Sequence, residues 1–119
     1  MAVSDIKKLT DLIIKHRDQR DWKQFHNSKD VAIALSLEAS EVLEQFRWLS
    51  KEEVEQYIQK HKKEIGDELS DVLYFILLMA HDLNIDIVKA FNRKMIENKK
   101  KYPVNKVKGK HLKYTAYQK

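Results

Sequence analysis

EIGDELSD at residues 64–71, followed at once by VLYFILLMA at residues 72–80, decides the fold. At the helical period of 100° per residue, the apolar residues at 65, 69, 72 and 76 form one stripe. Glu68 and Asp71 lie together beside this stripe, because residues three apart are neighbours on a helix. After Asp71 the helix is apolar all round, which is typical of a helix packed against protein on every side. Two carboxylates beside such a segment need a cation to compensate them, and a metal ion is the first candidate.

The composition suits one helical domain of 119 residues, with 34% charged and 43% hydrophobic residues but only two glycines and one proline. There is no cysteine, which excludes disulfides, a thiolate nucleophile and a zinc–cysteine site. Residues 1–8 lack the apolar core of a signal peptide, and the apolar run 72–80 is much shorter than the roughly 20 residues that span a bilayer. We therefore expect a cytoplasmic protein.

The net charge of +5 is concentrated at the C-terminus, where residues 104–119 hold five lysines and no acidic residue. The remaining residues carry 18 basic and 18 acidic side chains, so the body of the chain is neutral. We expect a helical domain at residues 1–103 and a basic tail at residues 104–119. The tail is either solvated, or docked on a partner, or an arm that attracts phosphate.

Apolar periodicity and capping residues predict four helices, so the fold class is all-α and the architecture is like a four-helix bundle. The third helix should be irregular around residues 61–63 or at Gly66. One or two residues are expected between the second and third helices, which should therefore be antiparallel. The expected helices run from Ser4 or Asp5 to Arg20, from Asn27 or Ser28 to Trp48, from Ser50 to Leu83, and from the Asn84–Ile87 region to a stop at Tyr102–Pro103.

Two acidic pairs are the candidate chemical site: Glu38 and Glu41, then 26 residues, then Glu68 and Asp71. Four carboxylates brought together repel one another unless divalent cations hold them ionised. Ligands that are all oxygen favour hard ions, and Mg²⁺ completes its shell with waters and substrate phosphates, so the pattern predicts a phosphate substrate. The alternative is two solvated acidic faces. A di-iron site is disfavoured because none of the five histidines follows a glutamate by three residues.

These acidic pairs, with DELSDVL around the second and KMIENKKKYP at residues 94–103, resemble the MazG-type all-α nucleoside triphosphate pyrophosphohydrolases. Within that family the dCTP pyrophosphatase branch is the most similar. The features that carry this closer resemblance are RDWKQFH at residues 20–26, FRW at 46–48 and KYT at 113–115.

The resemblance implies hydrolysis of a nucleoside triphosphate to a monophosphate and diphosphate, with Mg²⁺, which Mn²⁺ can replace, at the four carboxylates. It also implies a homo-oligomer, either a dimer or a dimer of dimers. From the short apolar run and the neutral body of the chain we expect no membrane partner, and a nucleic-acid partner is disfavoured. Alternatives are the same reaction on a nucleotide other than dCTP, or a helical interaction module without enzymatic activity whose basic tail binds nucleic acid.

The implied site comprises Glu38, Glu41, Glu68 and Asp71 for catalysis and metal, and Trp22, His26, Trp48, Phe75, Lys94, Asn98, Lys101 and Tyr102 for the substrate. Tyr74 is a further candidate wall of the base pocket.

Overall fold

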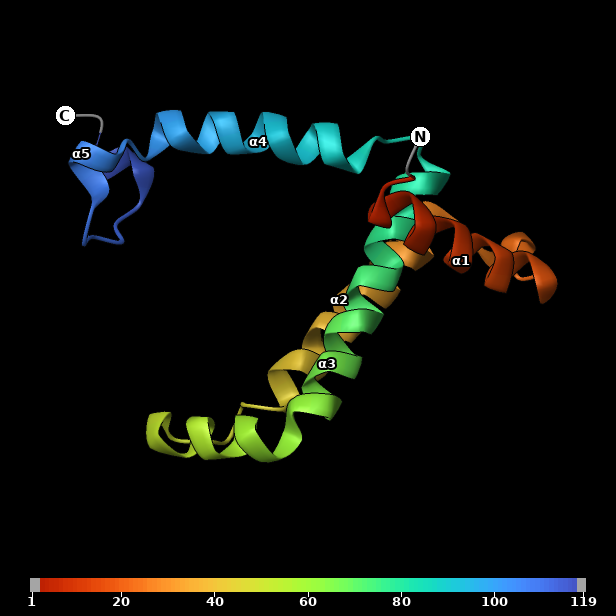
Figure 1. The fold of residues 1–119 in the computed structure, drawn as a ribbon, viewed down its shortest axis with the longest axis horizontal. Coiled ribbons are helices and arrows are strands. Elements are labelled where there is room, and N and C mark those ends of the chain that lie inside the picture. Colours follow the sequence, from red (N-terminus) through yellow and green to blue (C-terminus); the bar gives the residue numbers. More distant parts are fainter. Residues whose placement is uncertain (1–2, 118–119) are drawn as a thin grey trace. The chain divides into compact units, whose positions relative to one another are not determined.

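The computed structural model describes residues 3–117, which are helical throughout apart from turns and connecting segments; no strand occurs among them. The chain forms two compact units, one up to Ile85 and one from Asp86 onward (Figure 1). No helix in the described range is both long and apolar enough to cross a membrane. The first unit holds α1 (Asp5–Gln19), η1 (Lys23–Phe25), α2 (Ser28–Glu44) and α3 (Lys51–Asp82), and the second holds α4 (Ile87–Lys101), α5 (Val104–Val107) and η2 (Tyr114–Tyr117).

The N-caps confirm the predicted starts of the four long helices. Ser4, Asn27 and Asp86 each accept a hydrogen bond from the backbone three residues onward, at the starts of α1, α2 and α4. At α3, Ser50 and Glu53 form a reciprocal capping box. Local side-chain chemistry therefore fixes where these helices begin.

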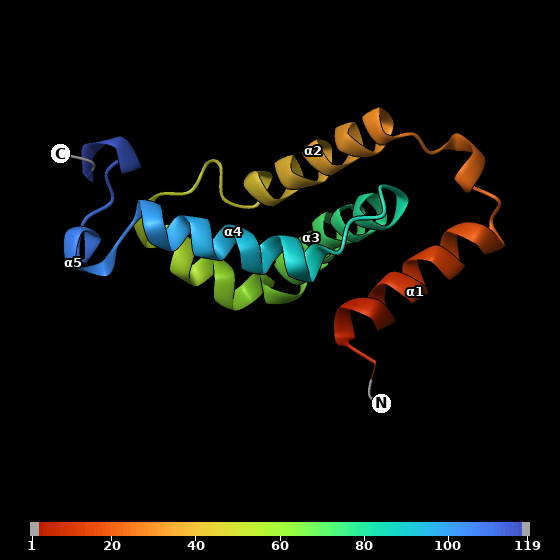
Figure 2. The ribbon, with the colours of Figure 1, turned by 90° about the horizontal axis from the view of Figure 1, so that it is seen from above.

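The predicted end of α2 was wrong. The helix ends at Glu44 rather than at Trp48, so six residues, not one or two, connect it to α3. Backbone bonds of the tighter i to i−3 type close the end, from Gln45 N–H to Val42 O and from Phe46 N–H to Leu43 O. The connection is still short, and α2 runs antiparallel alongside α3 as expected (Figures 1 and 2).

The predicted irregularity in α3 occurs at His61, which has non-helical φ and ψ angles of −125° and 25°. His61 Nδ1 lies 3.1 Å from the carbonyl oxygen of Tyr57, and the two rings stack 4.0 Å apart. The first part of α3 therefore bends away from the axis of the remainder (Figure 1). Gly66 lies within the helix after this bend and produces no break.

The core of the first unit lies where α1 and α2 pack on the C-terminal half of α3. Leu77 and Leu78 are almost completely buried there. Leu73 is 38% exposed, so α1 and α2 leave part of the apolar circumference of α3 uncovered. Arg17 on α1 is also buried, and its Nη1 donates to Asp82 Oδ1 of α3 at 2.7 Å, which joins the two helices by an ion pair.

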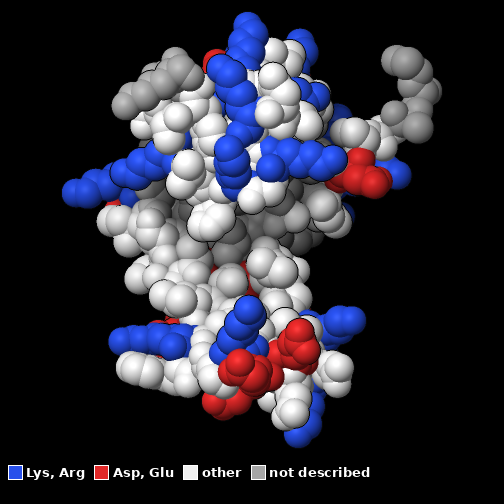
Figure 3. All heavy atoms as spheres, turned by 90° about the vertical axis from the view of Figure 1, so that its left-hand side faces the viewer, with Lys and Arg blue, Asp and Glu red and all other residues white. Residues whose placement is uncertain are grey.

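In the second unit the basic segment after Pro103 is folded. Tyr117 is buried, and its hydroxyl accepts a hydrogen bond from the Leu112 N–H at 2.8 Å. Its carbonyl oxygen accepts another from Lys106 Nζ at 3.2 Å. Tyr102 at the end of α4 meets the rings of Tyr114 and Tyr117 edge-on. Figure 3 shows many lysine and arginine side chains among the uncharged ones on the upper part of the face, where this C-terminal segment lies.

Candidate functional site

Three of the four predicted carboxylates converge between α2 and α3. Glu38, Glu68 and Asp71 each offer one oxygen, and these oxygens all lie within 4.8 Å of one another. Glu68 and Asp71 come from one face of α3, and the antiparallel α2 places Glu38 opposite them. Glu41, one turn further along α2, is not one of these three, but it has the largest effect of any neighbouring charge on Glu68. We call the three residues the acidic cluster.

The acidic cluster gathers several like charges in a small space. Burial raises the pKa of Glu68, and the neighbouring charges of Glu41, Asp71 and Glu38 raise it further. Within residues 3–85, no lysine or arginine forms an ion pair with any of these four carboxylates. Three carboxylate oxygens without nitrogen or sulfur ligands suit a hard divalent cation that keeps several waters. The donor set therefore fits the metal expected from the sequence.

A cavity of about 270 Å³ adjoins the acidic cluster. Glu38 and Asp71 form part of its wall. The rest of the lining is made of rings from α1, the α1–α2 connection and α3, namely His16, Trp22, His26, Tyr74 and Phe75. Carboxylates and aromatic rings therefore share one cavity. Trp22, His26 and Phe75, which the sequence suggested for the substrate, are among its lining residues, and their role there stays a prediction.

The turn after α1 brings Trp22 back toward the cavity. Asp21 adopts a left-handed conformation with φ of 53°, and both its carbonyl and its carboxylate accept hydrogen bonds from Gln24 Nε2. The Trp22 N–H then donates to the carbonyl of Arg17 at 3.1 Å. As a result the Trp22 ring lies edge-on to His16, with centroids 5.6 Å apart.

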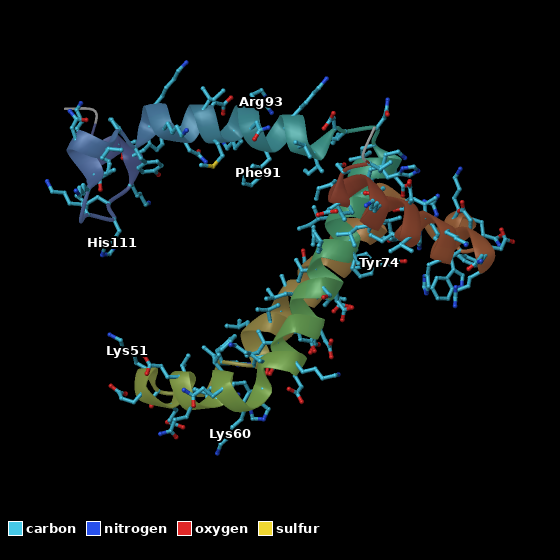
Figure 4. The ribbon with its side chains drawn as sticks, in the orientation of Figure 1. Lys51, Lys60, Tyr74, Phe91, Arg93 and His111 are labelled. Carbon is cyan, nitrogen blue, oxygen red and sulfur yellow. The ribbon has the colours of Figure 1, made fainter. Side chains whose placement is uncertain are left out.

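Two polar ring atoms of the cavity residues have little or no hydrogen bonding. His26 Nδ1 is buried and has no hydrogen-bond partner among the described residues. His16 Nδ1 has only a long contact of 3.5 Å with the Tyr74 hydroxyl. Figure 4 shows the Tyr74 side chain on the side of α3 that faces α1. A ligand in the cavity would thus meet stacking surfaces and imidazole nitrogens able to make hydrogen bonds.

His16 was not among the residues predicted for the site. Its spacing gave a usable signal, because it follows the buried Ile13 by three residues and therefore lies on the face of α1 that packs on α3. What the sequence could not show is that Trp22 folds back to the same place.

Trp48 does not line the cavity. It is 78% exposed, and the guanidinium of Arg47 lies 4.4 Å from the centre of its ring system. The remaining predicted substrate residues, Lys94, Asn98, Lys101 and Tyr102, belong to the second unit. There Lys101 lies over the Tyr114 ring and Lys94 pairs with Glu97. The roles expected for these residues stay predictions.

Residues 33–116 match the model of the MazG-like family. The protein named dCTP pyrophosphatase 1 from Rattus norvegicus is 35% identical over 99 residues, which cover 82% of this chain and 58% of that protein. Its namesake from Homo sapiens is 31% identical over 99 residues, with the same two coverages. The matched region thus spans less than two thirds of these relatives. A crystal structure of a pyrophosphatase from Archaeoglobus fulgidus DSM 4304 is similar with a TM-score of 0.82 and 33% identity, covering 87% of this chain and 96% of that one.

Proposed function

The chain belongs to the MazG-like family, and from that premise we propose that it is a Mg²⁺-dependent nucleoside triphosphate pyrophosphohydrolase acting on dCTP or a modified dCTP. The reaction adds water across the anhydride between the α and β phosphates and yields a monophosphate and diphosphate. The observation that carries the proposal is the acidic cluster beside an aromatic cavity, since a nucleotide needs a cation for its phosphates and a flat surface for its base. The names of the relatives support the choice of substrate.

The four carboxylates have two different roles in this proposal. Glu38, Glu68 and Asp71 hold the metal, because their oxygens are the ones that converge. A bound Mg²⁺ would neutralise the triphosphate and lower the pKa of a water molecule beside it. Glu41 stands next to the cluster without belonging to it, so its carboxylate is available to accept the proton of the attacking water.

The cavity holds the base. A volume of about 270 Å³ lies at the lower end of ligand pockets and suits a base with its sugar rather than a whole triphosphate. Trp22 and Phe75 offer faces for stacking, and His26 Nδ1 is a buried atom that a base edge could satisfy. Lys94, Asn98, Lys101 and Tyr102 bind the phosphates in this proposal, as the family resemblance implies.

The functional protein is proposed to be a homo-oligomer, as a dimer or a dimer of dimers. Large apolar side chains of the first unit support this, because Leu12, Leu37 and Leu43 are each at least 59% exposed. Light scattering on the purified chain tests it, and a monomer at micromolar concentration would contradict it.

Turnover in carboxylate variants tests the reaction. Wild-type protein should release diphosphate from dCTP when Mg²⁺ is present and lose activity when a chelator removes the metal. Glu68→Gln should abolish turnover and also abolish the rise in melting temperature that Mg²⁺ produces in the wild type. Glu41→Gln should abolish turnover yet keep the Mg²⁺-dependent rise, because Glu41 lies outside the cluster.

Glu64→Gln is the matched control, because Glu64 is an exposed glutamate one turn before Glu68 on the same helix. It should keep both turnover and the metal response. Full activity in Glu68→Gln would refute the metal site. A nucleotide panel decides the substrate, and a higher kcat/KM on any other triphosphate would replace dCTP in the proposal.

A further inference from the structure

We infer that His16 selects cytosine over uracil by donating a hydrogen bond from Nε2 to the ring nitrogen N3 of the base, with Tyr74 holding the imidazole in the required tautomer. The inference rests on the proposed function and adds to it the residue that reads the base. It starts from three observations: His16 lines the cavity, Tyr74 contacts its other nitrogen, and aromatic rings fix its plane.

The His16 ring is held from two sides. Trp22 meets it at an interplanar angle of 73° with centroids 5.6 Å apart, and Tyr74 meets it at 87° with centroids 6.1 Å apart. The backbone beneath it is anchored as well, because the next residue, Arg17, is buried and paired with Asp82 of α3. An imidazole held in this way offers its nitrogens in a fixed direction, which recognition of a base edge requires.

Tyr74 is the side chain placed to decide which nitrogen of His16 carries the proton, because its hydroxyl contacts Nδ1. Burial raises the pKa of the Tyr74 hydroxyl, against the opposing charges of Arg17 and Arg20, so the hydroxyl stays protonated at neutral pH. A phenol can donate or accept, and the contact of 3.5 Å with Nδ1 is at the outer limit of a hydrogen bond. In the proposed arrangement the Tyr74 hydroxyl is the donor. Nδ1 is then the acceptor, and a neutral imidazole with an acceptor at Nδ1 carries its hydrogen on Nε2.

A donor at Nε2 distinguishes the two pyrimidines by their chemistry. Cytosine N3 has a lone pair and accepts a hydrogen bond. Uracil and thymine carry a hydrogen on N3, so this N–H and the N–H of His16 Nε2 would be two donors facing each other. Uracil would therefore displace water from the Nε2 donor without replacing its hydrogen bond, which costs binding free energy. Sites that bury such a group reject the mismatched ligand by about 10⁴- to 10⁵-fold, and because His16 is exposed in the free chain we expect a smaller discrimination.

The test compares dCTP with dUTP, because these substrates differ only at position 4 and in the hydrogen on N3. Wild-type protein should favour dCTP by about a hundredfold in kcat/KM. His16→Phe keeps an aromatic ring against Trp22 and removes both nitrogens. It should lower the dCTP to dUTP preference at least tenfold, through a higher KM for dCTP with kcat little changed.

Tyr74→Phe gives a response that loss of packing alone would not produce. It keeps the ring beside Phe75 but frees the tautomer of His16, so Nε2 can accept from N3–H of uracil. KM for dUTP should therefore fall while KM for dCTP changes little. His111→Phe is the matched control, an exposed histidine of the second unit, and should leave both values unchanged (Figure 4).

The outcomes separate the inference from the proposed function. Diphosphate release from dCTP by the wild type, with an unchanged preference in both His16→Phe and Tyr74→Phe, overturns the inference alone. A wild type that hydrolyses dCTP and dUTP equally well also overturns it. A wild type that releases no diphosphate from any nucleotide refutes the proposed function, and the inference with it. If His16→Phe fails to fold, Tyr74→Phe decides by itself.

Discussion

Replacing Arg17 with methionine will show how strongly α1 is held against α3, and with it the α1 wall of the cavity. Arg17 is 2% exposed, and its guanidinium binds Asp82 Oδ1 at 2.7 Å and Asp18 Oδ1 at 3.1 Å. Methionine keeps most of the apolar length of the side chain but removes the charge. The substitution thus leaves the Asp82 carboxylate without its partner.

The magnitude follows from the exposure of Asp82. Breaking a fully buried ion pair costs about 3–5 kcal/mol, because the remaining charge has neither partner nor water. The Asp82 side chain is 28% exposed and recovers part of its hydration, so we expect a loss of about 2 kcal/mol. For a domain of this size that is a fall in melting temperature of roughly 8–16 °C.

Urea denaturation of the full chain, followed by far-ultraviolet circular dichroism, measures this loss. Lys7→Met is the matched control on the same helix, because the Lys7–Asp11 pair is exposed on both sides and should contribute no more than about 1 kcal/mol. Asp82→Asn and the double variant complete a double-mutant cycle. A coupling free energy near zero, or a midpoint for Arg17→Met equal to that of Lys7→Met, would refute the reasoning.

Three further predictions concern the metal site, the helix cap and the exposed tryptophan. Because the pKa of Glu68 is raised in the folded chain, the folded state binds its proton more tightly, so metal-free protein should lose thermal stability as the pH rises above the ordinary carboxyl value of 4.5. Saturating Mg²⁺ should remove this loss, and a melting temperature independent of both pH and metal would contradict the prediction. Ser50→Ala should lower the free energy of unfolding by about 1 kcal/mol with an unchanged denaturant m-value, since it removes one half of the capping box on α3; an unchanged urea midpoint would count against the cap. Trp48→Ala should raise KM for dCTP while leaving kcat and the melting temperature unchanged. Steady-state kinetics measure both constants, and a large fall in kcat would contradict the prediction and assign Trp48 to the chemical step.

Much of the fold could be read from local chemistry. The four N-caps were predicted within one or two residues, because capping side chains act on backbone groups three positions away. For the irregularity in α3 the sequence offered residues 61–63 or Gly66, and the structure has it at His61. The end of α2 was misplaced since no glycine or proline marks it. Tighter backbone bonds close that helix, and the Tyr57 hydroxyl donates to the side chain of Gln45 just beyond it. That contact comes from another helix, so a local pattern could not reveal it.

The sequence by itself determined the pairing of acids along each helix, because residues three apart share a face wherever the helix lies. It also determined that the basic charge gathers after Pro103. Only the tertiary structure decided which carboxylates meet. The packing of α2 on α3 brings one oxygen each of Glu38, Glu68 and Asp71 within 4.8 Å of one another, and, beside the burial that raises the pKa of Glu68, it places the charge of Glu41 near enough to raise that pKa further. The same packing of separate elements brings His16 of α1 to Tyr74 of α3, since contacts between distant segments depend on how whole helices fit together and not on spacing along one of them.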